Sequence, residues 1–173
     1  MSATAAGRGL WLSLVLAVCC GATSGTPELR LHTPWEAVTT PVAQGEDKPI
    51  AEWMLPNGLP NQELSNTQFV ELSTEDLGPG GLGGFVADRL STLDPKYVKG
   101  LHYAPIDTCL RPAWLFTFDD SFSGGTRSFE IVYLAVGETL YIADYSRPVD
   151  QPEDAIARAA VLDFCNTRKT TTP

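Results

Sequence analysis

The chain has 173 residues with 21 acidic and 12 basic side chains, so its formal net charge is −9. An acidic chain of this kind lacks the basic surface with which proteins bind nucleic acid or anionic lipid, and the sequence excludes both classes of ligand. The length suits a single domain that buries its own hydrophobic core.

The first 24 residues have the pattern of an export signal. Arg8 precedes an apolar run over residues 10–18, and small residues follow, as in a secretory signal peptide. The run is shorter than the roughly 20 residues that a stable transmembrane helix needs. We therefore expect residues 1–24 to be a signal peptide and the protein to be extracytoplasmic, at the outer side of the cell membrane or secreted. Its removal leaves 11 basic and 21 acidic residues, a net charge of −10.

Two ways of processing this leader remain open. The residues before Cys19 and Cys20 resemble a bacterial lipobox, although Val18 or Cys19 stands where Gly or Ala is expected. Lipidation of either cysteine would anchor the protein to the membrane, and the small residues 21–27 suit a flexible tether. Cleavage after Ala22 or Ser24 would instead release a secreted chain. We favour the lipid anchor, because cysteines in a signal region otherwise have no role.

Two cysteines, Cys109 and Cys165, remain after the leader. Two cysteines in an exported chain usually pair, so we expect a disulfide between them. By chain entropy, such a bridge stabilises the fold by up to about 4 kcal/mol. A catalytic dithiol usually forms a local Cys-x-x-Cys turn, which is absent here. A metal site would need His32 or His102, which share no ligand spacing with the cysteines.

Residues 25–65 form a proline-rich segment with six prolines between residues 26 and 65. Prolines at this frequency disfavour helices and central strands, so we expect an extended arm that precedes the domain. Trp35, Trp53 and Leu55 are unusually large apolar side chains for a spacer. They pack either on the protein's own domain or on a partner, and we treat them as candidate partner-binding residues.

Residues 66–168 show the patterns of a small α+β domain, followed by an expected disordered tail at 169–173. The first predicted segments are a strand at 68–72, a glycine-rich turn at 76–84, and a helix that starts at Phe85 and stops before Pro95. Strands follow at 97–103, 114–118, 128–136 and 139–145, and residues 152–154 then open a last helix that extends to about 164. The last three strands form an antiparallel meander, with a two-residue hairpin turn at 137–138. We expect the helices to cover one face of this sheet.

This order of elements behind a leader resembles actinobacterial exported lipoproteins of the LpqN type, which share a PsbP-like fold. The resemblance covers roughly residues 68–164 and rests on topology. It implies an envelope accessory protein or binding protein. The proline-rich arm departs from the family, whose domain begins with further strands.

Candidate catalytic groups are sparse in this sequence. It contains no Gly-x-Ser-x-Gly motif, and His102 is the one histidine in the predicted domain. Acidic pairs such as Asp119 and Asp120 are adjacent in one turn, whereas glycosidases need carboxylates on opposite sides of a substrate. We therefore expect no enzyme, no catalytic residues, no metal and no cofactor.

The leader, the aromatic arm and the acidic domain favour a non-enzymatic accessory protein of the cell envelope. We expect it to stabilise a membrane-associated assembly, whose membrane protein complex is its protein partner. The alternative is an extracytoplasmic binding module for a lipid or other apolar ligand. That alternative needs an uncovered apolar face on the aromatic meander, whereas core packing is the simpler interpretation of these aromatics.

Overall fold

The computed structural model describes residues 26–38, 49–56, 66–122 and 125–166. The predicted signal peptide at 1–24, the lipid anchors Cys19 and Cys20, and the tail at 169–173 lie outside the described residues. No helix within the described ranges is long and apolar enough to cross a membrane.

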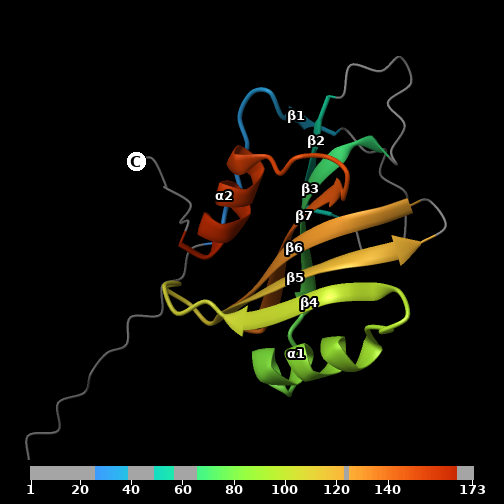
Figure 1. The fold of residues 1–173 in the computed structure, drawn as a ribbon. Coiled ribbons are helices and arrows are strands. Elements are labelled where there is room, and N and C mark those ends of the chain that lie inside the picture. Colours follow the sequence, from blue (N-terminus) through green and yellow to red (C-terminus); the bar gives the residue numbers. More distant parts are fainter. Residues whose placement is uncertain (1–25, 39–48, 57–65, 123–124, 167–173) are drawn as a thin grey trace, which may run out of the picture.

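One antiparallel sheet of seven strands forms the centre of the fold (Figure 1). The strands lie in the order β1-β2-β3-β7-β6-β5-β4. Their bounds are β1 Glu36–Ala37, β2 Ala51–Leu55, β3 Gln68–Asp76, β4 Val98–Pro105, β5 Ala113–Phe122, β6 Gly125–Val136 and β7 Thr139–Pro148. The helices are α1 Gly81–Thr92 and α2 Ala155–Asp163, and a 3₁₀ turn follows at Phe164–Asn166. The predicted α+β class is confirmed.

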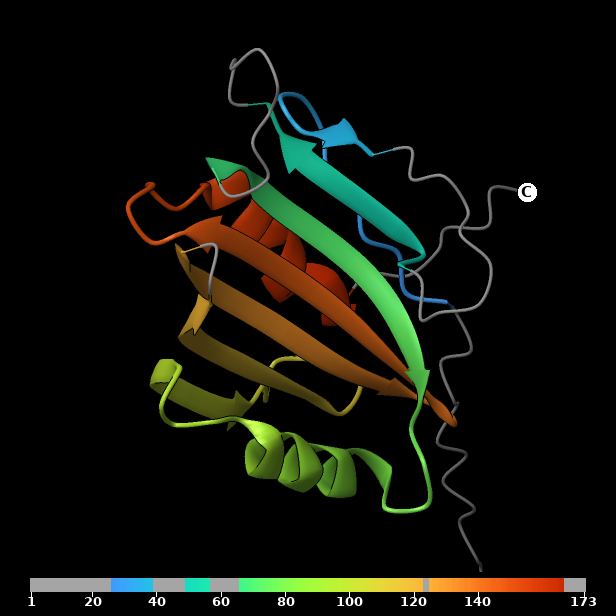
Figure 2. The same ribbon diagram turned by 90° about the vertical axis from the view of Figure 1, so that its right-hand side faces the viewer.

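The two helices lie on opposite faces of the sheet (Figure 2). Successive residues of a strand point to opposite faces. On β6, Val132 and Leu134 belong to the apolar cluster that α2 covers, and Ile131 and Tyr133 belong to the cluster that α1 covers. The expectation that both helices cover one face is therefore wrong. The apolar character of β6 on both sides arises because each side has its own helix.

Local signals place both helices. Asp154 caps α2, because its carboxylate accepts hydrogen bonds from the backbone N–H groups of Ile156 and Ala157 at 3.0 and 2.9 Å. Helix α1 begins at residue 81, four residues before the predicted start. The glycine-rich stretch turns the chain at Gly78, where φ is +67°, and then continues directly into the helix.

Part of the proline-rich arm joins the sheet. Strand β2 pairs with β3 over five residue pairs, and β1 pairs in turn with Trp53 and Met54 of β2. Pro49 and Pro56 flank β2 and do not interrupt it, so they remove no hydrogen bond within the strand. The expectation that this segment forms no sheet is wrong for β1 and β2.

Trp35 belongs to the core of the domain. Its side chain is 5% exposed, its ring lies edge-on to Tyr145 with centroids 6.2 Å apart, and its indole N–H donates to Asp154 Oδ1 at 3.3 Å. Trp35 is therefore inaccessible to a partner, which corrects its prediction as a partner-binding residue. Trp53 and Leu55 are half-buried against the same cluster and keep part of their surface exposed.

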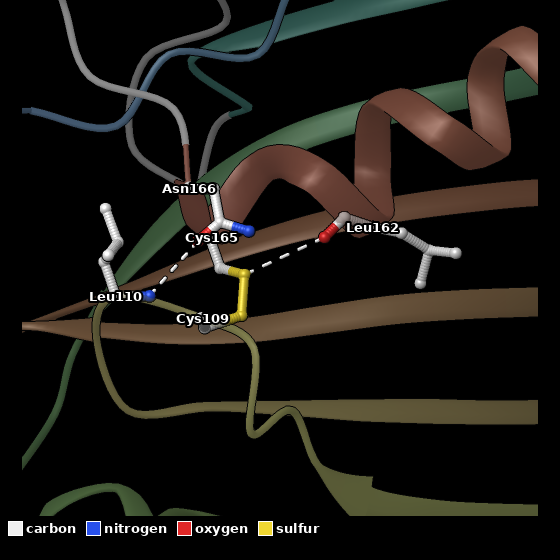
Figure 3. Close-up of a disulfide and its surroundings, with 5 residues drawn as sticks. All are labelled: Cys109, Leu110, Leu162, Cys165 and Asn166. Carbon is white, nitrogen blue, oxygen red and sulfur yellow. Dashed lines mark hydrogen bonds between the residues drawn. A yellow bond between two sulfur atoms is a disulfide. The ribbon is translucent and has the colours of Figure 1, made fainter.

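A disulfide joins Cys109 to Cys165, as predicted (Figure 3). Cys109 lies between β4 and β5, Cys165 lies in the 3₁₀ turn after α2, and their Cα atoms are 5.4 Å apart. Beside it, the backbone N–H of Leu110 donates to the side-chain oxygen of Asn166 at 3.2 Å. The bridge thus holds the end of α2 against the β4–β5 connection.

We expect Trp35→Ala to lower the free energy of unfolding by roughly 3–5 kcal/mol, because it leaves a large cavity and removes the indole contact with Asp154. Urea unfolding followed by circular dichroism measures the change. Trp53→Ala is the matched control, with a smaller loss because Trp53 is only half-buried. Equal and small losses for both variants would contradict the core position of Trp35.

The double variant Cys109→Ala/Cys165→Ala should lose roughly 2–5 kcal/mol of stability relative to the oxidised protein. The physical reason is that the bridge closes a separation of 56 residues in the unfolded chain. Thermal unfolding with and without reductant measures it, and reductant should affect the wild type only. An unchanged midpoint for the reduced wild type would show that the bridge does not support the fold.

Candidate functional site

Three carboxylates lie side by side on the sheet face that α1 partly covers. The strand register places Glu52 of β2 opposite Glu71 of β3, and Glu71 opposite Asp144 of β7. The same row continues into Ile131 of β6 and Phe116 of β5. Like charges directly opposite each other on neighbouring strands destabilise a sheet. We call Glu52, Glu71 and Asp144 the carboxylate row.

A cavity of about 400 Å³ lies between α1 and the strands that carry this row. We call it the α1 pocket. Its wall residues come from β3, β6, β7 and α1, and they are Glu71, Ser73, Glu75, Phe85, Asp88, Arg89, Thr92, Ile131, Tyr133, Ile142 and Asp144.

Backbone periodicity explains this lining. On β3, alternate residues from Glu71 to Glu75 share one sheet face. On α1, Phe85, Asp88 and Arg89 are three and four residues apart, which places them on one side of the helix. The pocket therefore has one wall of sheet carboxylates and one wall from the helix.

Burial and the nearby charge of Glu71 raise the pKa of Asp144 from 3.8 to about 7. The guanidinium groups of Arg127 and Arg89 act in the opposite direction. The Asp144 Oδ1 atom is shielded from solvent and has no hydrogen-bond partner among the described residues, and Nε of Arg89 is in the same situation. Burial, and then the charge of Glu52, raises the pKa of Glu71 as well.

Arg127 is held beside the row by other contacts. Its guanidinium donates to the carbonyl of Thr67 at 2.9 Å and to the hydroxyl of Ser146 at 3.1 Å. It also lies over the ring of Phe69, 5.6 Å from the centroid. Burial lowers the pKa of Arg127, and Asp144 opposes that shift. The residue thus reduces the negative charge near Asp144.

A second hollow, of about 550 Å³, lies at the C-terminal end of α1. It shares Arg89 and Thr92 with the α1 pocket and is bounded on its far side by Tyr97 and Asp120. The end of α1 therefore separates two polar hollows, and Arg89 lines both.

The lining of the α1 pocket is largely polar and charged. Among the residues that the structure describes, no set of three or more His, Cys, Asp or Glu side chains is arranged to hold a metal ion. His102, the candidate base, is exposed on β4. Its neighbour Tyr103 stacks on Phe116 of the α1 face, so His102 points to the opposite face, away from the pocket carboxylates.

Sequence reasoning missed this pocket. Glu71 and Asp144 belong to no motif and were treated as ordinary strand residues. The sequence does contain one signal, a carboxylate between apolar neighbours, as at Asp144 between Ala143 and Tyr145. This signal does not reveal that Glu71 lies opposite Asp144 on the neighbouring strand. Trp53, the sequence-based candidate for a partner contact, lies on the other face of the sheet, where it packs with the α2 cluster.

The fold and this pocket define a small α+β domain with a polar cavity on one sheet face. No family model and no curated protein matches the sequence. Among solved structures, the chain is similar in fold to LpqN of Mycobacterium tuberculosis, which is described as involved in cell envelope biogenesis. The TM-score is 0.50, with 16% identity over 83% of this chain and 83% of that chain. The LpqN-type topology predicted from the element order is thereby confirmed as a likeness in fold.

A second similar structure is PA94 of Pseudomonas aeruginosa, a protein of unknown function. The TM-score is 0.47, with 18% identity over 72% of this chain and 85% of that chain. We base no argument on that likeness.

The raised pKa of Asp144 predicts a stability change with pH. Well below pH 3.8 the carboxyl is protonated in both the folded and the unfolded chain, so it does not change the stability there. Between its ordinary pKa of 3.8 and its folded pKa of about 7, the unfolded chain ionises more readily, so stability falls as pH rises. Asp144→Asn removes this loss, and we expect it to be more stable than the wild type by about 2 kcal/mol at pH 8.

Urea unfolding at pH 4, 6 and 8 measures this difference, which should shrink towards zero at pH 4. Asp150→Asn is the control, because Asp150 is exposed and lies outside the pocket. An Asp144→Asn variant that is less stable than the wild type at every pH would show that the carboxylate stabilises the fold.

Proposed function

We propose that this protein is a non-enzymatic accessory protein of the cell envelope, exported across the membrane, which acts by binding a membrane-associated protein complex. The observation that carries the proposal is the disulfide between Cys109 and Cys165. Disulfides persist in oxidising compartments outside the cytoplasm. The leader pattern at residues 1–24 points to the same compartment. The likeness in fold to LpqN, which is described as involved in cell envelope biogenesis, supports an envelope role.

The chemistry of the α1 pocket supports binding as the activity. Within the described residues, its lining contains carboxylates, one arginine, one tyrosine and small hydroxyls, without an imidazole or a thiol. Nucleophilic catalysis needs a nucleophile, a base and a group that orients the base. His102, which was the candidate base, lies on the other face of the sheet. A role as a binding protein therefore accounts for the pocket more simply than a hydrolase does.

The alternative of an apolar ligand has less support. One apolar cluster is covered by α2 and Trp35, and the other is covered by α1 through Val86. A lipid site needs an apolar cavity, whereas the wall of the α1 pocket is rich in carboxylates. Trp53 and Leu55 remain our candidates for contact with the protein partner. The side chains of Trp53 and Leu55 are partly exposed, and the short strand β1 pairs with only two residues of β2.

Purification of the tagged full-length protein from detergent-solubilised membranes tests the proposal. We expect a membrane protein to co-purify in stoichiometric amount, with the cysteines oxidised. Leu55→Ala should weaken this association several-fold, because it removes an apolar anchor from β2. Ile156→Ala is the matched control, since Ile156 is an exposed apolar residue on α2, 48% accessible.

The association is compared well below the unfolding midpoint of each variant, so that lost stability does not imitate lost binding. Two free thiols, a cytoplasmic location, or lipid that co-purifies without any protein would each contradict the proposal.

A further inference from the structure

We propose that the α1 pocket binds an organic cation, a ligand that carries an ammonium or guanidinium group on a short apolar chain. The carboxylates of Glu71 and Asp144 hold the charged group, and Ile131 and Ile142 contact the chain. This inference concerns the ligand of the pocket and does not depend on the envelope role proposed above.

The charge of the pocket favours a cation. Its lining contains the acidic residues Glu71, Glu75, Asp88 and Asp144 and one basic residue, Arg89. Arg127 supplies further positive charge near Asp144, and its guanidinium also donates hydrogen bonds to Thr67 and Ser146. A negative excess of this size repels anions and attracts a ligand of opposite charge.

The register of the sheet makes this excess unavoidable. Glu52, Glu71 and Asp144 lie directly opposite one another on three neighbouring strands, roughly 4.8 Å apart from strand to strand. A shift of the register would move them to the other face, but it would also expose the apolar residues that α2 covers. The fold therefore holds the carboxylates together, and a bound cation removes the repulsion between them.

Asp144 is the second observation that points to a ligand. The residue lines the pocket, and its Oδ1 atom is buried with no hydrogen-bond donor among the described residues. Buried carboxylates in native proteins are normally paired with a donor. An ammonium or guanidinium ligand carries the N–H donor that this oxygen lacks.

The aromatic and apolar residues of the pocket lining favour an organic cation over a metal ion. The rings of Phe85 and Tyr133 lie against each other at the pocket, with centroids 5.0 Å apart, and aromatic faces attract organic cations. Ile131 and Ile142 provide an apolar surface for a carbon chain. The described residues contain no set of three or more His, Cys, Asp or Glu side chains that is arranged to hold a metal ion. A volume of about 400 Å³ accepts a small molecule or one long side chain.

This ligand chemistry has two sources, a free amine and a lysine or arginine side chain of a peptide. Titration calorimetry at pH 8 on the oxidised full chain tests both with separate probes. The first probe is agmatine, which carries one amine and one guanidinium. The second is the capped tripeptide acetyl-Gly-Arg-Gly-amide. Mg²⁺ and the same tripeptide with citrulline, which has the shape of arginine without its charge, are the negative controls.

We expect at least one of the two cationic probes to bind, and Mg²⁺ and the citrulline peptide to fail. Glu71→Gln and Asp144→Asn should each weaken binding at least tenfold, whereas Asp150→Asn should leave it unchanged. Binding should weaken from pH 8 to pH 5, because Asp144, whose pKa is raised to about 7, takes up a proton over this range. If agmatine binds more tightly than the arginine peptide, the ligand is a free amine. If the peptide binds more tightly, the ligand is a side chain of a partner.

The proposal is wrong if neither probe binds at millimolar concentration, or if both neutralising variants bind as the wild type does. It is equally wrong if the citrulline peptide binds as tightly as the arginine peptide. Because the probes are added to the purified protein, any of these results leaves the test of the envelope partner unaffected.

Discussion

Strand β6 is covered by a helix on each of its faces, and this constraint arranges the rest of the molecule. Val132 and Leu134 pack under α2, while Ile131 and Tyr133 pack towards α1. A shift of one residue in the pairing of β6 with β5 or β7 would exchange the two sets and expose both clusters, so the register is fixed by packing on both sides. The pairing of β6 with β7 places Asp144 opposite Ile131, and the pairing of β3 with β7 then places Glu71 opposite Asp144.

The carboxylate row lies where this cover ends. In the row that runs across the sheet, Phe116 and Ile131 belong to the apolar cluster that α1 covers, and Asp144 and Glu71 follow on the next strands. The transition from apolar to acidic residues therefore marks the boundary between core and pocket. Like charges opposite each other on neighbouring strands repel and destabilise the sheet. Such unfavourable arrangements are expected at functional sites rather than in a core selected for stability.

Much of the fold could be predicted from local patterns, because the responsible interactions are local. The hairpin between β6 and β7 follows from the turn at 137–138. Helix α2 lies where Pro152 and the two acidic residues after it predict a helix, although it begins at Ala155, because Asp154 caps it rather than belonging to its first turn. The assignment of helices to faces could not be predicted, since apolar residues on both sides of β6 do not reveal which helix covers which side. Strand β2 was missed because its pairing with β3 is non-local. The pocket was missed because Glu71 and Asp144 meet only through the pairing of β3 with β7.

The two faces of the sheet differ in what holds them together. On the α2 face, the hydroxyl of Tyr145 donates to the Gln68 side chain at 2.6 Å and accepts from the backbone N–H of Asp154 at 2.8 Å. The disulfide and the buried ring of Trp35 close the same side. On the α1 face, the helix packs through apolar contacts such as the ring of Phe85 on Tyr133, and the same two rings border the pocket. The disulfide and the hydrogen bonds of Tyr145 therefore fasten the α2 face, whereas the α1 face combines an apolar core with the row of like charges. A fold held firmly elsewhere can tolerate such unfavourable charges at a binding site.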